Sequence, residues 1–200
     1  MTSASVALSG ATVEGIERAA ARGSFDGLSR VFHWTTVLLI GFLGATGYLV
    51  HFAPAFASGL LIWHRSAGVG VWFVTILRLA WRRTFARLPP FPESMGTLHR
   101  LTATASEYLL YVMLLAQPLT GLAATLTLGL PLKLVGVRVA PLMTENLPLS
   151  QALHELHEKG ALALFSLIFI HASAALFHHY VLKDDILVTM LPRLGKRQCP

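Results

Sequence analysis

Residues 159–182 read KGALALFSLIFIHASAALFHHYVL, and this stretch decides the fold. Between Lys159 and Lys183 no Asp, Glu, Lys or Arg occurs. The run exceeds the roughly 20 residues that a helix needs to cross the hydrocarbon core of a membrane. Strands of a membrane barrel would be about half as long and would alternate in polarity, which these residues do not. The stretch therefore predicts a transmembrane helix with His171 near its middle.

Three further apolar segments precede it, at about 31–51, 60–81 and 98–126. Ser24 or Asp26 is a candidate cap for a helix that begins near residue 26. The longest connection, about 127–156, contains three prolines and is amphipathic enough to lie against the membrane or to cap the bundle. We therefore predict an all-α fold, an integral membrane bundle of four transmembrane helices.

The composition supports a membrane protein and excludes other classes. Hydrophobic residues make up 54% of the chain and charged residues 13%, about half the charged share of a soluble domain. A mean hydropathy of +0.60 excludes intrinsic disorder, which needs low hydrophobicity and high charge. The single cysteine, Cys199, excludes an intrachain disulfide and covalent haem attachment through two cysteines. The net charge of +6 is assigned to membrane anchoring, and no nucleic acid partner is expected.

Basic residues predict the orientation of the spans. They gather around the connection between the second and third spans, on the N-terminal flank and in the C-terminal tail: Arg78, Arg82, Arg83, Arg87 and Arg100; Arg18, Arg22 and Arg30; Lys183, Arg193, Lys196 and Arg197. The positive-inside rule then puts both termini in the cytoplasm. We predict a cytoplasmic extension without a signal peptide over 1–29, a transmembrane domain over 30–193 and a cytoplasmic tail over 194–200.

Histidines carry the candidate chemistry, because an ionisable residue inside a bilayer is costly and marks a functional site by default. His157 and His171 are 14 residues apart, which places them on one helix face about 21 Å apart along the axis. Two ligands separated by most of a bilayer suggest one cofactor near each leaflet. In the predicted topology His33 lies at the level of His171, and His64 lies at the level of His157.

The resulting pairs are His33 with His171 and His64 with His157. Paired imidazoles on facing helices are how bundles hold haem b, since they occupy both axial positions of the iron. His51 is an alternative to His64, and His178 is an alternative to His171. Small residues in the first two spans leave room for a macrocycle or permit close helix packing: Gly41, Gly44, Gly47, Gly68 and Gly70.

Several short motifs occur in a fixed order along the chain. They are Arg30-Val31-Phe32-His33-Trp34, Trp63-His64-Arg65-Ser66-Ala67-Gly68, Pro118-Leu119-Thr120-Gly121, His157-Glu158, His171-Ala172, His178-His179-Tyr180, Lys183-Asp184 and Met190-Leu191-Pro192-Arg193. This set resembles the bacterial cytochrome b561 family, which is related to the b-type subunits of nickel hydrogenases. The resemblance covers about 30–193.

The resemblance implies a bacterial inner-membrane protein with two non-covalent b haems that carries electrons across the membrane. The family ligands fall on His33, His64, His157 and His171. Some members oxidise superoxide and reduce ubiquinone, which implies a quinone-linked oxidoreductase in contact with lipid. Carried over, Arg65, Lys133, Arg138 and Lys159 would supply a positive field for an anion, and His178, His179 and Lys183 would contact quinone or a haem propionate.

The chain departs from the family pattern at one place, and two other functions are alternatives to the one that the resemblance implies. Relatives often carry histidine early in the third span, where this chain reads Thr102-Ala103-Thr104-Ala105-Ser106-Glu107; Glu107 is either solvated at the interface or serves proton uptake. One rival function is a haem-b anchor subunit of a larger dehydrogenase or hydrogenase complex, with a partner protein as electron donor. The other is a histidine-lined transporter for metal ions or protons, which usually has several carboxylates within its spans. The donor and the oligomeric state, including a homodimer, stay open.

Overall fold

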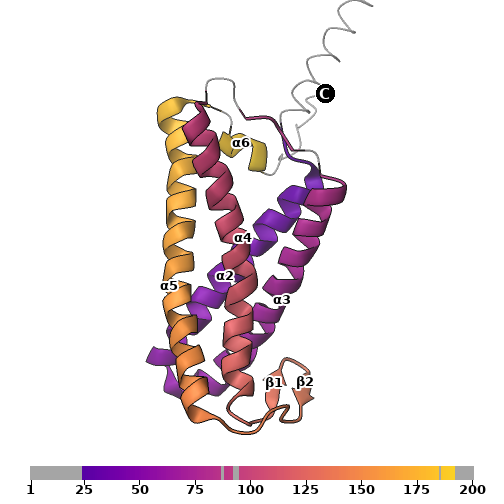
Figure 1. Ribbon diagram of the computed structural model, residues 1–200, viewed down its shortest axis with the longest axis vertical. Coiled ribbons are helices and arrows are strands. Elements are labelled where there is room, and N and C mark those ends of the chain that lie inside the picture. Colours follow the sequence, from indigo (N-terminus) through magenta and orange to yellow (C-terminus); the bar gives the residue numbers. More distant parts are fainter. Residues whose placement is uncertain (1–23, 87, 92–94, 185, 192–200) are drawn as a thin grey trace, which may run out of the picture.

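Four long helices form an elongated bundle in a computed structural model of the chain (Figure 1). The structure describes residues 24–86, 88–91, 95–184 and 186–191. Most of the predicted N-terminal extension, Arg87 and the predicted tail over 194–200 therefore lie outside the described residues.

The four helices are α2 (Gly27–Phe52), α3 (Ala57–Thr84), α4 (Thr97–Leu126) and α5 (Leu147–Phe177). Each is long and apolar enough to cross a membrane, which confirms the four predicted spans. A short 3-10 helix, η1 (Pro54–Phe56), joins α2 to α3. The chain continues beyond α5 as a single π-helical segment, η2 (His178–Leu182), and then as the short helix α6 (Ile186–Met190).

The carboxylate of Asp26 starts the first helix, as the sequence predicts. Its Oδ1 accepts a hydrogen bond from the backbone N–H of Ser29 at 2.9 Å, so it satisfies one of the free amides at the start of α2. The same oxygen accepts a bond from Trp81 Nε1 at 3.0 Å. The cap therefore also joins the beginning of α2 to the end of α3.

The fourth span begins about twelve residues earlier than predicted. The sequence assigns 147–156 to the connection, yet α5 begins at Leu147, where the side chain of Asn146 caps it by accepting from Leu149 N at 3.1 Å. Pro148 is compatible with this start, because the first turn of a helix needs no amide hydrogen from proline. The first three turns of α5 were missed because their polar side chains lower the hydropathy of the segment.

The connection before α5 contains a small hairpin that the all-α prediction omitted. Strands β1 (Leu132–Leu134) and β2 (Val137–Val139) pair antiparallel, with Lys133 opposite Arg138. Gly136, at φ 72°, adopts the left-handed conformation that the tight turn requires. Ser66 Oγ accepts a hydrogen bond from Val135 N at 2.8 Å and so holds the hairpin against α3.

The centre of the bundle is one apolar layer to which each long helix contributes one buried side chain. These side chains are Ile40, Val71, Leu114 and Leu164. Close to this layer, a Cβ at Gly44 would lie 2.6 Å from Phe165 Cζ, so this glycine makes room on α2 for the Phe165 ring of α5. We call Ile40, Val71, Leu114 and Leu164 the core layer.

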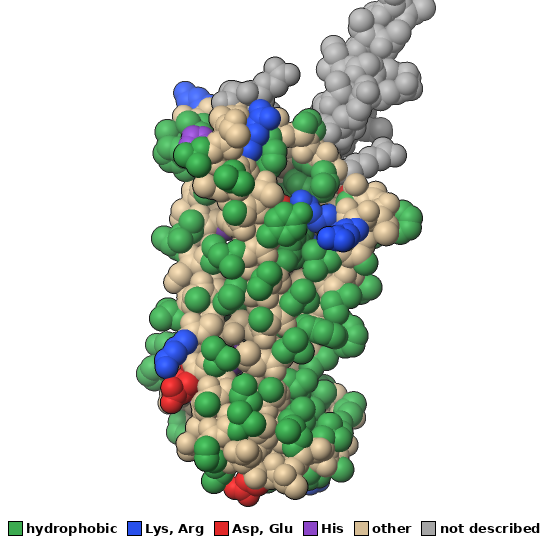
Figure 2. Space-filling model, viewed as in Figure 1, with side chains coloured by type: hydrophobic (Ala, Val, Ile, Leu, Met, Phe, Trp, Pro, Cys, Tyr) green, Lys and Arg blue, Asp and Glu red, His purple; other side chains and the backbone are tan. Residues whose placement is uncertain are grey.

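The described ends of the chain meet at one end of the bundle. Trp34 Nε1 donates to Met190 O at 2.9 Å, and Arg30 donates to Leu191 O at 3.1 Å. Figure 2 shows hydrophobic side chains along the whole visible face, with most of its Lys and Arg toward the end that carries α6. This distribution is expected of a bundle that crosses a membrane with that end in the cytoplasm.

Candidate functional site

Two polar layers flank the core layer at equal distances. Counting seven residues from each core residue toward one end reaches Gly47, His64, Gly121 and His157; counting seven toward the other end reaches His33, Arg78, Glu107 and His171. Seven residues span about 10 Å and nearly two full turns, so the helix face is kept. We call the first set the glycine layer and the second the charged layer.

The glycine layer brings two of the predicted histidines into contact. The ring centroids of His64, on α3, and His157, on α5, lie 6.2 Å apart with an angle of 85° between the ring planes. His51, the alternative to His64, points elsewhere: its Nε2 lies 3.9 Å from Glu158, and its side chain is 63% exposed. The fold therefore presents His64, and not His51, to His157.

Hydrogen bonds orient both rings of the glycine layer. His157 Nδ1 lies 3.0 Å from Gln117 O, and a carbonyl can only accept, so this nitrogen carries the hydrogen of the neutral ring. His64 Nδ1 lies 3.0 Å from Thr46 Oγ1, whose own hydrogen is directed to Phe42 O at 2.9 Å. The Thr46 hydroxyl therefore accepts a hydrogen bond from His64 Nδ1, which carries the hydrogen of that ring too. In both rings Nε2 keeps its lone pair, as an imidazole ligand to a metal requires.

The two glycines leave space that the rings occupy. A Cβ at Gly121, on α4, would lie 2.9 Å from His157 Cε1, and a Cβ at Gly47, on α2, would lie 3.3 Å from His64 Cε1. The distance at Gly121 is shorter than real Cβ contacts in proteins, so a side chain there would have to displace the His157 ring. Gly47 and Gly121 therefore make room for the imidazole rings of His64 and His157. The predicted alternatives for Gly47, room for a macrocycle or close helix packing, stay predictions.

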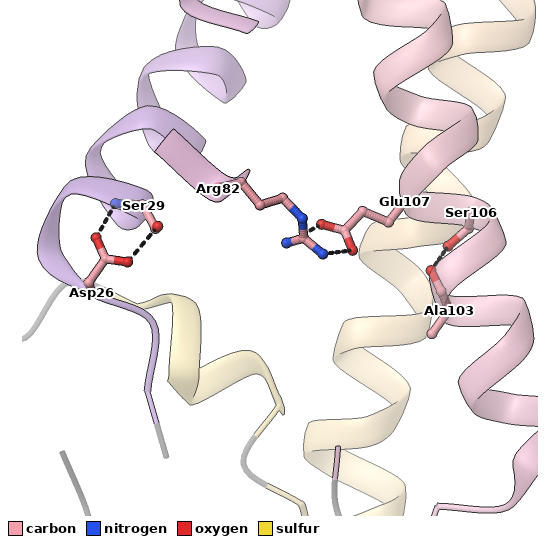
Figure 3. Close-up of polar contacts among 6 residues, drawn as sticks. All are labelled: Asp26, Ser29, Arg82, Ala103, Ser106 and Glu107. Atoms are coloured by element: carbon pink, nitrogen blue, oxygen red, sulfur yellow. Dashed lines mark hydrogen bonds and ion pairs between the residues drawn. The ribbon is translucent and has the colours of Figure 1, made fainter. Parts of the chain in front are cut away.

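The charged layer is built from ionic groups. Arg82 on α3, one turn beyond Arg78, makes a two-point ion pair with Glu107 on α4, with both N–O distances 2.9 Å (Figure 3). Glu107 is therefore neither freely solvated nor isolated. The Arg78 guanidinium lies 5.3 Å from the centre of the Tyr111 ring. Arg78, Arg82 and Arg83, which the sequence analysis placed around a connection, all belong to α3.

Few local contacts hold the two histidines of the charged layer. His33 meets the ring of Trp34 edge to face, with 5.6 Å between centroids. Neither His33 nor His171 has a hydrogen bond to another described residue. His178, the alternative to His171, has its Nδ1 2.5 Å from Asp184 Oδ2. In the part of the chain that the structure describes, no three His, Cys, Asp or Glu side chains gather as a metal-ion site.

Further cations surround the end of the bundle that carries the glycine layer. The hydrogen bond from Val135 N to Ser66 holds the hairpin against α3 at the residue that follows Arg65 in the sequence. Lys133 and Arg138 face each other across its strands, and both are exposed. Lys159, by contrast, is paired with Glu155 at 3.1 Å on the exposed surface of α5.

Sequence reasoning missed the polar groups that orient the histidines: Thr46, Gln117 and Thr120. Thr120 Oγ1 lies 3.2 Å from His157 Nδ1 and 2.8 Å from Gln117 O. A signal was present for two of them, since Gln117 and Thr120 flank Pro118 and polar side chains commonly satisfy the backbone near a proline in a membrane helix.

Comparison with known proteins identifies the family. Residues 24–193 match the family model for prokaryotic cytochrome b561. The chain belongs to the prokaryotic cytochrome b561 family. It is 32% identical over 167 residues to cytochrome b561 homolog 1 of Escherichia coli strain K12, covering 80% of this chain and 93% of that protein. It is 27% identical over 166 residues to the probable superoxide oxidase CybB of Yersinia pestis, covering 80% and 92%.

A third relative is cytochrome b561 homolog 2 of Escherichia coli strain K12, with 26% identity over 175 residues, covering 82% of this chain and 89% of that protein. The chain is thus a b-type cytochrome that crosses the bacterial inner membrane several times, and its family carries b-type haem and serves electron transport.

The glycine layer fits such a haem. An imidazole nitrogen bonds a transition metal at about 2 Å, so two axial rings on one iron have centroids about 6 Å apart. The rings of His64 and His157 are 6.2 Å apart, and the lone pair of each Nε2 is available. The donor set and its spacing therefore suit a bis-imidazole iron.

Proposed function

We propose that this cytochrome holds two b haems and conducts electrons across the membrane between them. His64 and His157 would hold one haem near the periplasmic surface, and His33 and His171 would hold the other near the cytoplasmic surface. The observation that carries the proposal is the pair His64 and His157, because their ring separation and hydrogen bonds suit two imidazoles that hold one iron. Haem, when bound, would supply reversible one-electron chemistry.

The chain's own residues do the positioning. Thr46 and the carbonyl of Gln117 hold the rings of the glycine layer in one tautomer and one orientation. Between the two layers the core layer keeps the path apolar and excludes water. The separation of about 20 Å between the layers, fourteen residues on each helix, spreads the two sites over most of the hydrocarbon thickness.

We further propose superoxide as donor and quinone as acceptor. Arg65, Lys133 and Arg138 would attract an anion at the periplasmic end, since like charges opposite each other on a hairpin concentrate positive potential. One relative is named a probable superoxide oxidase. Two superoxide ions would each lose one electron and leave as dioxygen. One quinone would take both electrons and two protons to become quinol, near His178, His179 and Lys183.

The test is a dithionite-reduced minus oxidised spectrum of the protein purified in detergent, with haem and protein quantified. We expect b-type bands and about two haems per chain, one for each histidine pair. His64→Ala and His171→Ala should each leave about one haem, whereas exposed His99→Ala and His154→Ala should leave two. Two haems in His171→Ala would reject the assignment of that pair. A second arm supplies superoxide and ubiquinone; absence of quinol formation would reject the donor and acceptor.

A further inference from the structure

Arg78 is the charged group in the bundle that the proposed function leaves unexplained. It belongs to the charged layer, seven residues beyond Val71 on α3, and its side chain is half-buried. One turn further, Arg82 is already paired with Glu107. Arg78 has no carboxylate partner among the described residues, and its guanidinium lies 5.3 Å from the centre of the Tyr111 ring.

A guanidinium at this depth needs an anion. Ionisable groups within membrane helices are costly and normally pair with an opposite charge or a functional ligand. Tyr111 attracts the cation through its ring, but a neutral phenol does not balance the positive charge as an anion does. The fixed fork of an arginine matches the two oxygens of a carboxylate, which a lysine cannot reproduce.

Arg78 faces a small crevice at this end of the bundle. This crevice, on the cytoplasmic side of the charged layer, is lined by Arg78, Arg82 and Ser29, with Tyr111 and Met190 beside them. Ser29 lies one turn before His33 on α2, so the crevice begins where the histidine pair ends.

The other polar groups at the crevice are already engaged. Ser29 Oγ donates to Asp26 Oδ2 at 2.7 Å, and Arg82 is held by Glu107. His178, which the sequence analysis considered for a propionate, is held by Asp184. Arg78 is thus the cation at this crevice that no carboxylate of the described residues pairs with.

We propose that Arg78 binds a propionate of the haem held by His33 and His171. The inference rests on the proposed function, because it needs a haem in the charged layer. Haem b carries two ionised propionates on one edge, and these must turn toward the polar end of the bundle, where the crevice lies. The same chemistry would also recognise the acidic headgroup of a lipid, and the experiment separates the two sources.

The experiment follows transfer of haem from the detergent-solubilised protein to excess apomyoglobin, in wild type, Arg78→Gln, Arg78→Lys and Arg83→Gln. Arg83 lies on the last turn of α3, is exposed, and does not line the crevice, so it is the matched control. We expect Arg78→Gln to accelerate one of two phases on the order of tenfold, the value of one charge-assisted hydrogen bond. Arg78→Lys should be intermediate, and Arg83→Gln should match wild type.

A second measurement repeats the transfer after reconstitution with the dimethyl ester of haem b, which lacks free carboxylates. The difference between wild type and Arg78→Gln should then vanish. A difference that persists with the ester means that Arg78 only supports the fold, and it overturns the proposal. Unchanged haem transfer in Arg78→Gln also overturns the proposal. If that variant in addition loses co-purified anionic lipid, the anion at Arg78 is a lipid headgroup and not a propionate. Wild type with fewer than two haems would instead reject the proposed function.

Discussion

The glycine layer and the charged layer lie on the same four helices at the same distance from the core layer, yet they consist of different kinds of residue. In the glycine layer, α2 and α4 contribute Gly47 and Gly121, and neutral hydrogen-bonding groups orient the imidazoles. In the charged layer, α3 and α4 contribute Arg78 and Glu107, and the imidazoles have no hydrogen bond to a described residue. The glycine layer is defined by the space that its glycines leave and the charged layer by its ionic groups, so one bundle gives the histidines of its two layers different environments.

The largest expected effect comes from filling the glycine layer. Gly121→Leu places a side chain where the His157 ring lies, since even a Cβ would approach Cε1 to 2.9 Å. We expect one haem per chain to be lost and the haem of the charged layer to remain. Haem quantification after purification measures this. Gly41→Leu, where an added Cβ meets nothing within 4 Å, is the control and should keep both haems.

Removing the hydrogen bond to His64 should weaken the same site without filling it. Thr46→Val keeps the side-chain shape but deletes the acceptor for Nδ1, and loss of such a partner costs roughly 10–100-fold in metal affinity. One phase of haem transfer to apomyoglobin should accelerate accordingly. Thr36→Val is the matched control, because Thr36 is also buried and bonds only the carbonyl of Phe32. Equal acceleration in both variants would show that the threonines act through helix stability.

Neutralising Glu107, the acid of the charged layer, should lower the stability of the protein and change the reduction potential of one haem. Glu107→Gln leaves Arg82 without its ion-pair partner; the side chains are 24% and 30% exposed, between a surface pair and a buried one, so we expect a loss of about 2 kcal/mol. Removing a negative charge should also raise the reduction potential of the haem in the charged layer only. Thermal unfolding and a redox titration measure the two effects.

The control for that variant is Glu155→Gln, which breaks the exposed pair with Lys159, where the side chains are 67% and 77% exposed. This change should move neither the unfolding temperature nor either potential, because exposed pairs contribute little. An equal shift of both haem potentials in Glu107→Gln would contradict the assignment of Glu107 to one layer.

The smallest expected effect is at Gly47. A Cβ there would lie 3.3 Å from His64 Cε1, close enough to displace the ring by a few tenths of an ångström and no more. Gly47→Ala should keep both haems and alter the low-temperature electron paramagnetic resonance signal of one of them. An unchanged signal would indicate that the glycine layer tolerates a methyl group on α2 although it excludes one on α4.

Much of the fold follows from local sequence. Asp26 predicts the start of α2, because a carboxylate before an apolar run satisfies free amides. The hairpin was missed although Leu132-Lys133-Leu134 and Val137-Arg138-Val139 alternate around Val135-Gly136, a readable signal of a two-residue turn. The first turns of α5 were missed because a hydropathy criterion detects only the part of a helix that lies in lipid.

The sequence by itself determined that four apolar helices cross a membrane and that His157 and His171 share one face of the last of them, since length, hydrophobicity and helical period are local properties. Only the tertiary structure decided that His64 and not His51 meets His157, that Arg82 pairs with Glu107, and that Gly47 and Gly121 make room for the rings. The physical reason is that lipid is as apolar as the bundle interior, so hydrophobicity does not mark the buried face of a membrane helix. The rotation of each helix is set by close packing and polar contacts between residues far apart in the chain.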